Sequence, residues 1–278
     1  MTSDLHLHSY VSDGTLDPAA VLTHAAAAGI QQLSIADHDS LGAYAWEGGR
    51  VFGEARRLGL TLVVGLEMDA ELAGVEVHLL GYDVQQGDNA LTAHLARVTE
   101  LRRERARREI EIVNRLLGGA AVSEAEILVP WRQTLMKPHF IHPLLEKGFF
   151  ASYKAANAWY KQNVQAGVEL TKPALGQAIE LVHSAGGWAV LAHPGYYGRE
   201  GLVIAPRLAE LKNLGLDGVE VEYPYHACSP DAFSVETERA LTEELRTVAG
   251  GLGLRTTRGS DCHTPADFAR VYGIARGV

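Results

Sequence analysis

Short apolar segments alternate with helical patterns along the first eighty residues. Apolar side chains at every second position share one face of a strand, and those three or four positions apart share one face of a helix. On this basis we expect strands at 33–36, 61–66 and 75–79 and helices at 19–28 and 43–58. Asp17 can cap the first helix, and Pro18 suits its first position. The repeated strand–helix units predict an α/β fold with a largely parallel sheet or barrel.

The strand–helix alternation stops between residues 87 and 172. This stretch has no convincing strand pattern, whereas 101–117 and 152–164 have helical patterns. We therefore predict an α/β barrel domain formed by 1–86 and 173–278, with 87–172 inserted as a mostly helical lobe. After the insertion we expect helices at 175–185, 206–214 and 231–249 and strands at 188–192, 218–222 and 255–260.

Composition narrows the class of protein. The 278 residues are 47% hydrophobic and 21% charged, and no apolar run approaches the roughly 18 residues needed to span a bilayer. Two cysteines, Cys228 and Cys262, suit a reducing compartment, and the start of the chain has no basic-then-apolar signal region, so we expect a cytoplasmic protein. The net charge of −9 argues against binding long duplex nucleic acid, but it is compatible with a small phosphorylated substrate in a local basic pocket. We see no sign of an obligatory protein partner.

Histidine and acidic residues are paired at both ends of the chain. His6 and His8 lie two positions apart, as do Asp261 and His263. On an extended strand the members of each pair share one face. Imidazole and carboxylate groups are ligands of divalent metals, so these pairs indicate a metal centre and metal-assisted chemistry.

Further polar residues stand where other predicted strands end. These are Asp37, His38, Glu67, His78 and His193. In parallel α/β folds the carboxyl ends of the strands meet on one face, and functional sites are built there. A single histidine after a strand is more often structural. Repetition of this placement at several strands favours one common site, because an imidazole or carboxylate buried without a partner is costly.

The remaining histidines have simpler interpretations. His24 and His183 lie on predicted helices, and we expect the first at the surface and the second in a structural role. His139 and His142 lie in the inserted lobe, where one can face the cleft while the other packs. His226 follows a predicted strand end and could contact a substrate.

Five arginines between residues 102 and 108 form the densest basic run. They can form a solvated helix face with acidic partners four residues away, such as Glu109. Alternatively, Arg102 and Arg105, one helical turn apart, can hold a phosphate through forked hydrogen bonds. Spacing favours the first interpretation, and both stay open.

Six short motifs occur in a characteristic order. They are Asp4-Leu5-His6-Leu7-His8-Ser9, Ser12-Asp13-Gly14, Ala36-Asp37-His38-Asp39, Gly65-Leu66-Glu67, Ala192-His193-Pro194 and Gly259-Ser260-Asp261-Cys262-His263. This combination resembles the polymerase and histidinol phosphatase (PHP) family of metal-dependent phosphoesterases. The resemblance implies a distorted seven-stranded (β/α) barrel with two or three divalent metal ions at the strand carboxyl ends, and a mixed nitrogen and oxygen donor set accepts Mn, Fe or Zn alike. The ligands it implies are His6, His8, Asp13, His38, Glu67, His78, His193, Asp261 and His263.

The inserted lobe makes the chain similar to one bacterial branch of that family. The branch includes nucleoside 3′,5′-bisphosphate phosphatases and enzymes that trim short RNA from its 5′ end. This similarity implies that the substrate is contacted by Arg102, Arg105, Lys137, His139 and His226. At a position where relatives tend to carry arginine, this chain has Lys137. The lysine ammonium is a point charge, whereas the arginine guanidinium is a planar fork, so the sequence leaves open which phosphate group is recognised.

The expected reaction is hydrolysis of a phosphate ester of a small nucleotide or short oligonucleotide by attack of a metal-activated hydroxide. His193 or Asp37 could move a proton. By the resemblance, Asp37 would otherwise be an outer or substrate-side residue. Three alternatives stay open: a histidinol-phosphate phosphatase, an amidohydrolase-type enzyme that cleaves C–N bonds, and a metal-stabilised domain without catalysis. The sequence offers no mid-barrel lysine of the kind that an amidohydrolase normally needs.

Overall fold

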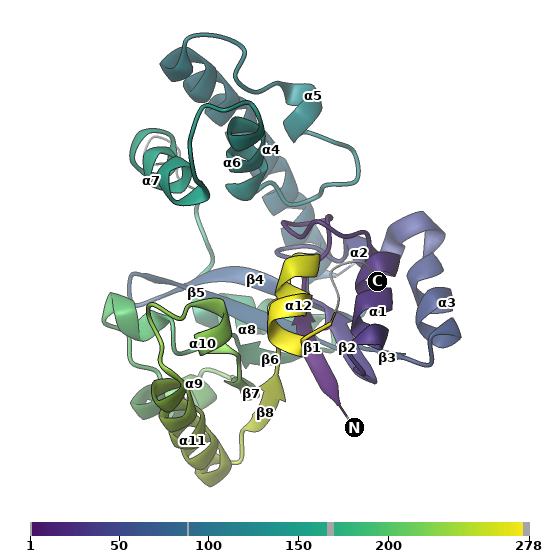
Figure 1. Cartoon of the computed structure of the whole chain (residues 1–278). Helices are drawn as coiled ribbons and strands as arrows, with labels where there is room; N and C mark the ends of the chain where they lie inside the picture. Colours follow the sequence, from purple (N-terminus) through teal and green to yellow (C-terminus); the bar gives the residue numbers. More distant parts are fainter. Residues whose placement is uncertain (1, 88, 166–169, 275–278) are drawn as a thin grey trace.

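The strands form two hydrogen-bonded sheets, shown in Figure 1. This computed structural model describes the chain except residues 1, 88, 166–169 and 275–278. The first sheet is parallel, in the order β1 (Ser3–Leu7), β2 (Gln32–Ile35) and β3 (Thr61–Leu62). The second has the order β4 (Gly65–Leu72), β5 (Val75–Tyr82), β6 (Trp188–Leu191), β7 (Gly218–Glu222) and β8 (Arg255–Arg258). The fold is therefore mixed α/β, as predicted, while closure into a seven-stranded barrel stays a prediction.

Isolated parallel bridges connect the two sheets. One joins Leu7 to Cys262 and the other joins His38 to Glu67. The second bridge links residues that the sequence singles out as metal ligands. The junction between the sheets therefore coincides with the candidate site.

The expectation of a largely parallel sheet was wrong for β5. This strand is antiparallel to both β4 and β6. The reason is a two-residue turn at Ala73 and Gly74, whose φ angles of 54° and 80° are both left-handed. Such turns match the twist of a hairpin. The hairpin pairs Asp69 with His78, so two residues of the candidate site lie opposite each other.

The helix predicted at 43–58 was wrong as a continuous element. It consists of α2 (Gly42–Ala45), a 3₁₀ turn (Trp46–Gly48) and α3 (Arg50–Arg57). The break lies at Glu47, Gly48 and Gly49, whose φ angles of 44°, 70° and 87° are incompatible with a helix. By contrast, α1 (Pro18–Ala27) begins as predicted, because the Asp17 side chain accepts a hydrogen bond of 2.8 Å from the Ala20 amide.

The strand predicted at 61–66 is also interrupted, and the Tyr44 hydroxyl lies at the interruption. Tyr44 is buried, and its oxygen accepts from the amides of Ile35 (3.2 Å) and Gly65 (3.0 Å). It also lies 2.9 Å from the carbonyl oxygen of Val63. One side chain thus ties β2 to the start of β4.

The inserted stretch forms α4 (Ala90–Leu117), α5 (Glu124–Ile127), α6 (Pro138–Glu146) and α7 (Tyr153–Asn163). Figure 1 shows these helices above the sheets, with the start of α4 reaching down toward the strands. In the described ranges between β5 and α8, no strand occurs. Helix α4 begins earlier than predicted because Asn89 caps it, accepting from the Thr92 amide at 2.9 Å. The lobe has its own hydrophobic core, to which Val113, Phe140 and Tyr160 belong.

The remaining helices pack around the second sheet or next to α1. They are α8 (Leu175–Ser184), α9 (Leu208–Asn213), α10 (Tyr225–Cys228), α11 (Val235–Leu252) and α12 (Pro265–Tyr272). The expected surface position of His24 was wrong: its ring is buried against Phe268 of α12, and Nδ1 lies 2.9 Å from the Ala20 carbonyl oxygen. His183 is structural, as predicted, and contacts Asp217 at 2.8 Å. Over the described residues, no helix combines the length and apolarity needed to cross a membrane.

We expect Tyr44→Phe to lower the free energy of unfolding by about 1–3 kcal/mol, because two buried amides lose their acceptor. Urea unfolding followed by circular dichroism measures the change. Tyr153→Phe, at an exposed position on α7, is the control and should shift the value by less than about 0.5 kcal/mol. Equal unfolding curves for the two variants would contradict the role of the Tyr44 hydroxyl.

Candidate metal centre

The carboxylate of Glu67, near the start of β4, lies at the centre of a cluster of imidazoles. Only 1% of Glu67 is exposed. From Oε2 the distances are 3.2 Å to His6 Nε2, 3.4 Å to His8 Nε2 and 3.2 Å to His38 Nε2, and from Oε1 they are 2.9 Å to His78 Nδ1 and 3.1 Å to His193 Nε2. The two oxygens thus face different imidazoles. A carboxylate in this position can bridge two cations.

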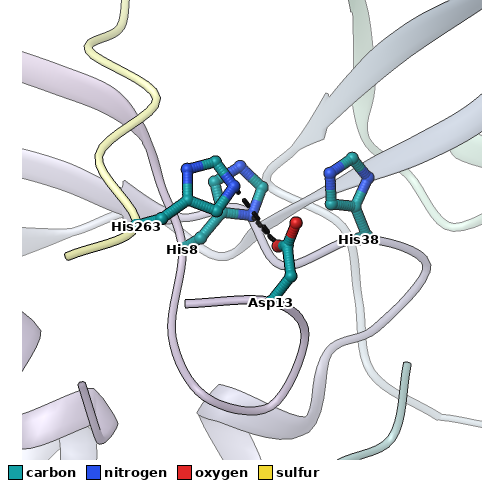
Figure 2. A group of neighbouring side chains, drawn as sticks. All are labelled: His8, Asp13, His38 and His263. Carbon is teal, nitrogen blue, oxygen red and sulfur yellow. Dashed lines mark ion pairs between the residues drawn. The ribbon is translucent and has the colours of Figure 1, made fainter. Parts of the chain in front are cut away.

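A second part of the cluster surrounds Asp13 and is drawn in Figure 2. Asp13 Oδ1 lies 3.3 Å from His263 Nε2 and 3.7 Å from His8 Nδ1. The rings of His8 and His263 are stacked, with centroids 4.2 Å apart and an interplanar angle of 8°. Asp261 joins the two parts, because its Oδ1 lies 3.0 Å from His8 Nε2 and 3.6 Å from His6 Nε2.

These contacts merge into overlapping sets of ligand atoms that lie within 4.8 Å of one another. Among the described residues the sets are His8, Asp13, His38 and His263; His6, His8, Glu67 and Asp261; His38, Glu67 and His78; and Asp69, Glu76 and His78. These sets contain eight of the nine residues that the sequence nominated, and the ninth, His193, lies beside them with its Nε2 3.1 Å from Glu67 Oε1. Shared members make the four sets one continuous centre.

Backbone strain accompanies this convergence. Asp261 has a φ angle of 56° and His193 one of 23°, both in the left-handed region that side-chain-bearing residues rarely adopt. Each of these two residues lies shortly after the end of a strand, and its side chain points into the cluster. Such strain persists where surrounding contacts over-determine the conformation, and it concentrates at functional sites.

The donor set fits a metal centre. Nε2 of His6 and Nε2 of His8 are buried and have no well-aligned hydrogen bond to any described residue, although carboxylate oxygens lie within 3.2 Å. The opposite nitrogens have partners: His6 Nδ1 contacts Glu220 Oε1 at 3.1 Å, and His8 Nδ1 lies 3.4 Å from the Ser12 hydroxyl. Metal-bound imidazoles typically have their second nitrogen held in this way.

Electrostatics in the cluster favour a bound cation. Burial by itself would lower the pKa of His38, but the carboxylates of Glu67, Asp13 and Asp69 raise it to about 9. In the same way, Asp13 and Asp261 overcome burial and raise the pKa of His263 to about 10. Protons on these rings balance the carboxylates at neutral pH. A metal ion would have to displace such protons.

Three residues that surround the cluster were not predicted as part of it. Glu220 on β7 is fully buried and also accepts a 2.8 Å hydrogen bond from the His193 amide. Asp69 lies 3.2 Å from His38 Nδ1, and the Tyr223 hydroxyl donates to Asp261 Oδ2 at 2.9 Å. Asp69 could have been found, because it lies two positions after Glu67 on the same strand and therefore on the same face.

Gly259 shows how closely this surrounding layer approaches the ligands. A Cβ atom at this glycine would lie 2.1 Å from Glu220 Oε1 and 2.3 Å from His6 Cβ. No larger residue fits without moving one of them. The glycine of the last motif therefore permits the contact between Glu220 and His6.

Asp37 holds the loop that carries Asp13. It accepts from the Ser9 amide at 2.8 Å and from the hydroxyls of Ser9 and Ser12, both at 2.6 Å. Both carboxylate oxygens are thus engaged by this loop. An outer position agrees with the expectation for Asp37, whereas its role in moving a proton stays a prediction.

The arginine run divides into different environments. Arg102 is buried, so a solvated helix face is wrong for this residue; its Nη2 donates to Asp39 at 2.6 Å and to Asp69 at 2.8 Å. Arg105 pairs with Glu109 at 2.8 Å, four residues along the helix, as the first interpretation expects. Phosphate contact by Arg102 or Arg105 stays a prediction.

The other expected substrate residues lie at different places. His139 is buried and its Nδ1 accepts from the Met136 amide at 2.9 Å; burial lowers the pKa of His139 to about 3, so its ring is neutral. Lys137 lies at the start of α6, where burial, together with the positive charge of Lys161, lowers its pKa. His226 Nδ1 lies 2.8 Å from the Phe233 carbonyl oxygen, and its contact with substrate stays a prediction.

Comparison with known proteins agrees with this geometry. The chain is 28% identical to a 3′,5′-nucleoside bisphosphate phosphatase of Chromobacterium violaceum, covering 97% of this chain and 90% of that protein. It is 29% identical to the 5′-3′ exoribonuclease Rnm of Escherichia coli, covering 95% and 86%. It is 30% identical to a phosphoribosyl 1,2-cyclic phosphate 1,2-diphosphodiesterase of Eggerthella lenta, covering 98% and 97%.

Two solved structures have the same fold over most of the chain. One, from Bifidobacterium adolescentis, has a TM-score of 0.77 at 24% identity and covers 95% of this chain and 88% of its own. The other is described as an amidohydrolase from Chromobacterium violaceum with bound sulfate and no metal; it has a TM-score of 0.74 at 26% identity and covers 96% and 89%. The PHP domain model matches residues 4–183. The chain therefore belongs to the PHP family of metal-dependent phosphoesterases.

Proposed function

We propose that this protein hydrolyses phosphate esters of small nucleotides, either nucleoside 3′,5′-bisphosphates or short 5′-phosphorylated RNA. The observation that carries the proposal is the continuous centre around Glu67, which can hold more than one cation beneath a lobe that bears positive charge. The names of the bisphosphate phosphatase and exoribonuclease relatives support the substrate class.

The centre would hold two or three divalent ions, with Mn, Fe and Zn all suited to a mixed nitrogen and oxygen donor set. We assign the first position to His6, His8, Glu67 and Asp261 and the third to Asp13, His38 and His263. The second position would use Glu67 and His78, with His193 added because its Nε2 lies 3.1 Å from Glu67 Oε1. When bound, such ions lower the pKa of water to about 7 and neutralise charge on the phosphoryl oxygens. We also propose that the strands form the distorted seven-stranded barrel of the family, with 87–172 as its inserted lobe.

The protein's own groups would orient the reacting phosphate and handle protons. Glu67 directs one oxygen toward His6 and His8 and the other toward His193, so it would keep neighbouring cations at a set separation. As an alternative to holding an ion, His193 would move a proton more readily than Asp37, because its Nε2 lies 3.1 Å from Glu67 Oε1 whereas both oxygens of Asp37 are engaged by Ser9 and Ser12. Asp37 would act by holding the Asp13 loop.

The lobe would hold a second phosphate through Lys137, with Arg105 and Lys161 contributing charge and His139 shaping the wall. Burial and the positive charges of Lys161 and Arg105 lower the pKa of Lys137, and the carboxylates of Glu76 and Asp13 offset this only in part. Cations gathered in this way repel one another, and a bound phosphate would relieve the repulsion. In a protein with a net charge of −9, such a local basic region can concentrate an anionic substrate.

An amidohydrolase reaction is the second candidate, because one similar solved structure carries that description. The test is a screen of purified, metal-loaded protein for phosphate release. We expect release from a nucleoside 3′,5′-bisphosphate or a short 5′-phosphorylated RNA to exceed release from a nucleoside monophosphate and from histidinol phosphate. Activity on histidinol phosphate alone, or on cyclic amides without any phosphate release, would overturn the proposal.

We expect Lys137→Met to raise KM for a nucleoside 3′,5′-bisphosphate about tenfold or more, because one charged hydrogen bond to the second phosphate is lost. The KM for a monophosphate should change much less. Steady-state kinetics with both substrates measures the difference. Lys154→Met, at an exposed position on α7, is the matched control. Equal effects of Lys137→Met on both substrates would exclude a second-phosphate contact.

Metal affinity should rise with pH. His38 and His263 have pKa values raised to about 9 and about 10, so both are protonated at neutral pH before a metal binds. Each proton that a metal displaces makes affinity increase up to about tenfold per pH unit below those pKa values. Calorimetric titration with Mn²⁺ at pH 6.5 and pH 8.0, in buffers of different ionisation enthalpy, measures affinity and proton release. Binding that is independent of pH would contradict the prediction.

A further inference from the structure

The guanidinium of Arg102 reaches from the lobe helix α4 into the base of the metal centre. Only 4% of this residue is exposed. Its Nη2 donates to Asp39 Oδ2 at 2.6 Å and to Asp69 Oδ2 at 2.8 Å, and its Nη1 donates to the Leu135 carbonyl oxygen at 3.5 Å. A buried guanidinium with two carboxylate partners is a strong and directional contact.

The second oxygen of Asp69 faces the candidate ligands. Asp69 Oδ1 lies 3.2 Å from His38 Nδ1 and 3.7 Å from His78 Nε2. On its other side, the His38 ring directs Nε2 to Glu67 at 3.2 Å. Contacts therefore run without interruption from Arg102 through Asp69 and His38 to Glu67.

Asp39 holds the same unit together from the backbone. Its φ angle of 44° is left-handed. Its amide donates to the Glu67 carbonyl oxygen at 2.7 Å, and its Oδ1 accepts from the Asp69 amide at 3.3 Å. From the lobe, the Thr134 hydroxyl also donates to the carbonyl oxygen of His38. The lobe therefore contacts His38 in two ways: Arg102 binds Asp69, which lies beside the His38 ring, and Thr134 binds the backbone of His38.

A metal-binding imidazole uses one nitrogen for the ion, and an acceptor at the other nitrogen sets its tautomer and orientation. Asp69 Oδ1 and His38 Nδ1 lie 3.2 Å apart without a well-aligned hydrogen bond, so Asp69 becomes that acceptor through a small rotation of the His38 ring and only while its carboxylate stays beside the ring. Without Arg102, Asp39 and Asp69 would be two buried carboxylates with no cation between them, and they would repel each other. Arg102 therefore determines where Asp69 lies.

We propose that Arg102 and Asp69 are positioning residues that orient His38 for metal binding, so that the inserted lobe controls metal retention by the centre. The proposal rests on the metal centre of the proposed function but requires no particular substrate. It differs from a phosphate contact, in which Arg102 would touch the substrate directly.

The test compares metal retention by the full-length protein and by the variants Asp69→Asn and Arg102→Lys. Each protein is loaded with Mn²⁺ and dialysed, its metal content is measured by mass spectrometry, and its Mn²⁺ affinity is measured by titration. We expect a 10- to 100-fold weaker affinity for at least one ion in both variants, which is the usual effect of removing an outer partner of a metal-bound histidine. Excess Mn²⁺ should restore kcat, with KM unchanged.

Arg107→Lys is the matched control, since it makes the same change at an exposed position of α4 and should retain wild-type metal content. If Arg102→Lys fails to fold, as shown by its thermal unfolding, Asp69→Asn and the charge-balanced double variant Arg102→Met with Asp39→Asn carry the test. Wild-type affinity in Asp69→Asn would overturn the proposal. So would wild-type metal content in Arg102→Lys with a raised KM for a bisphosphate, which would instead establish a phosphate contact.

Failure of the proposed function would look different. In that case the wild-type protein would release no phosphate from any nucleotide substrate, whereas the metal content of the wild-type and variant proteins would still differ as expected. The two ideas can therefore be rejected separately.

Discussion

The carboxylate of Glu67 is the constraint on which the rest of the molecule depends. A buried carboxylate is stable only when partners replace the water that it has lost. Five imidazole nitrogens within 3.4 Å supply these partners, and they come from β1, from the loops after β1, β2 and β6, and from β5. The bridge between His38 and Glu67 also joins the two sheets. The fold and the centre are therefore held by the same contacts.

A surrounding layer of polar residues gives this centre its geometry. Glu220 fixes His6, Asp69 lies against His38, and Tyr223 fixes Asp261. These contacts explain how Asp261 can keep a left-handed backbone, because the packed surroundings over-determine its position. They also orient the imidazoles before a metal arrives, so less ordering is needed when one binds.

The inserted lobe has two relations to the centre. Its separate hydrophobic core makes it a packed unit in its own right. Lys137 near the start of α6 is proposed as a substrate contact, while Arg102 of α4 is engaged with Asp39 and Asp69 at the base of the centre. One insertion can thus affect both substrate binding and metal binding, through residues on different helices.

The sequence by itself nominated nine residues that lie together around Glu67 and predicted most of the local elements. Strand periodicity paired His6 with His8, and the cap at Asp17 set the start of α1. Both are local signals, which neighbouring residues carry. Only the tertiary structure decided that β5 runs antiparallel and that Arg102, alone among the five arginines between 102 and 108, is buried between two carboxylates. Strand direction and charge pairing depend on contacts between residues far apart in the chain, and a local pattern does not encode which distant partner is met.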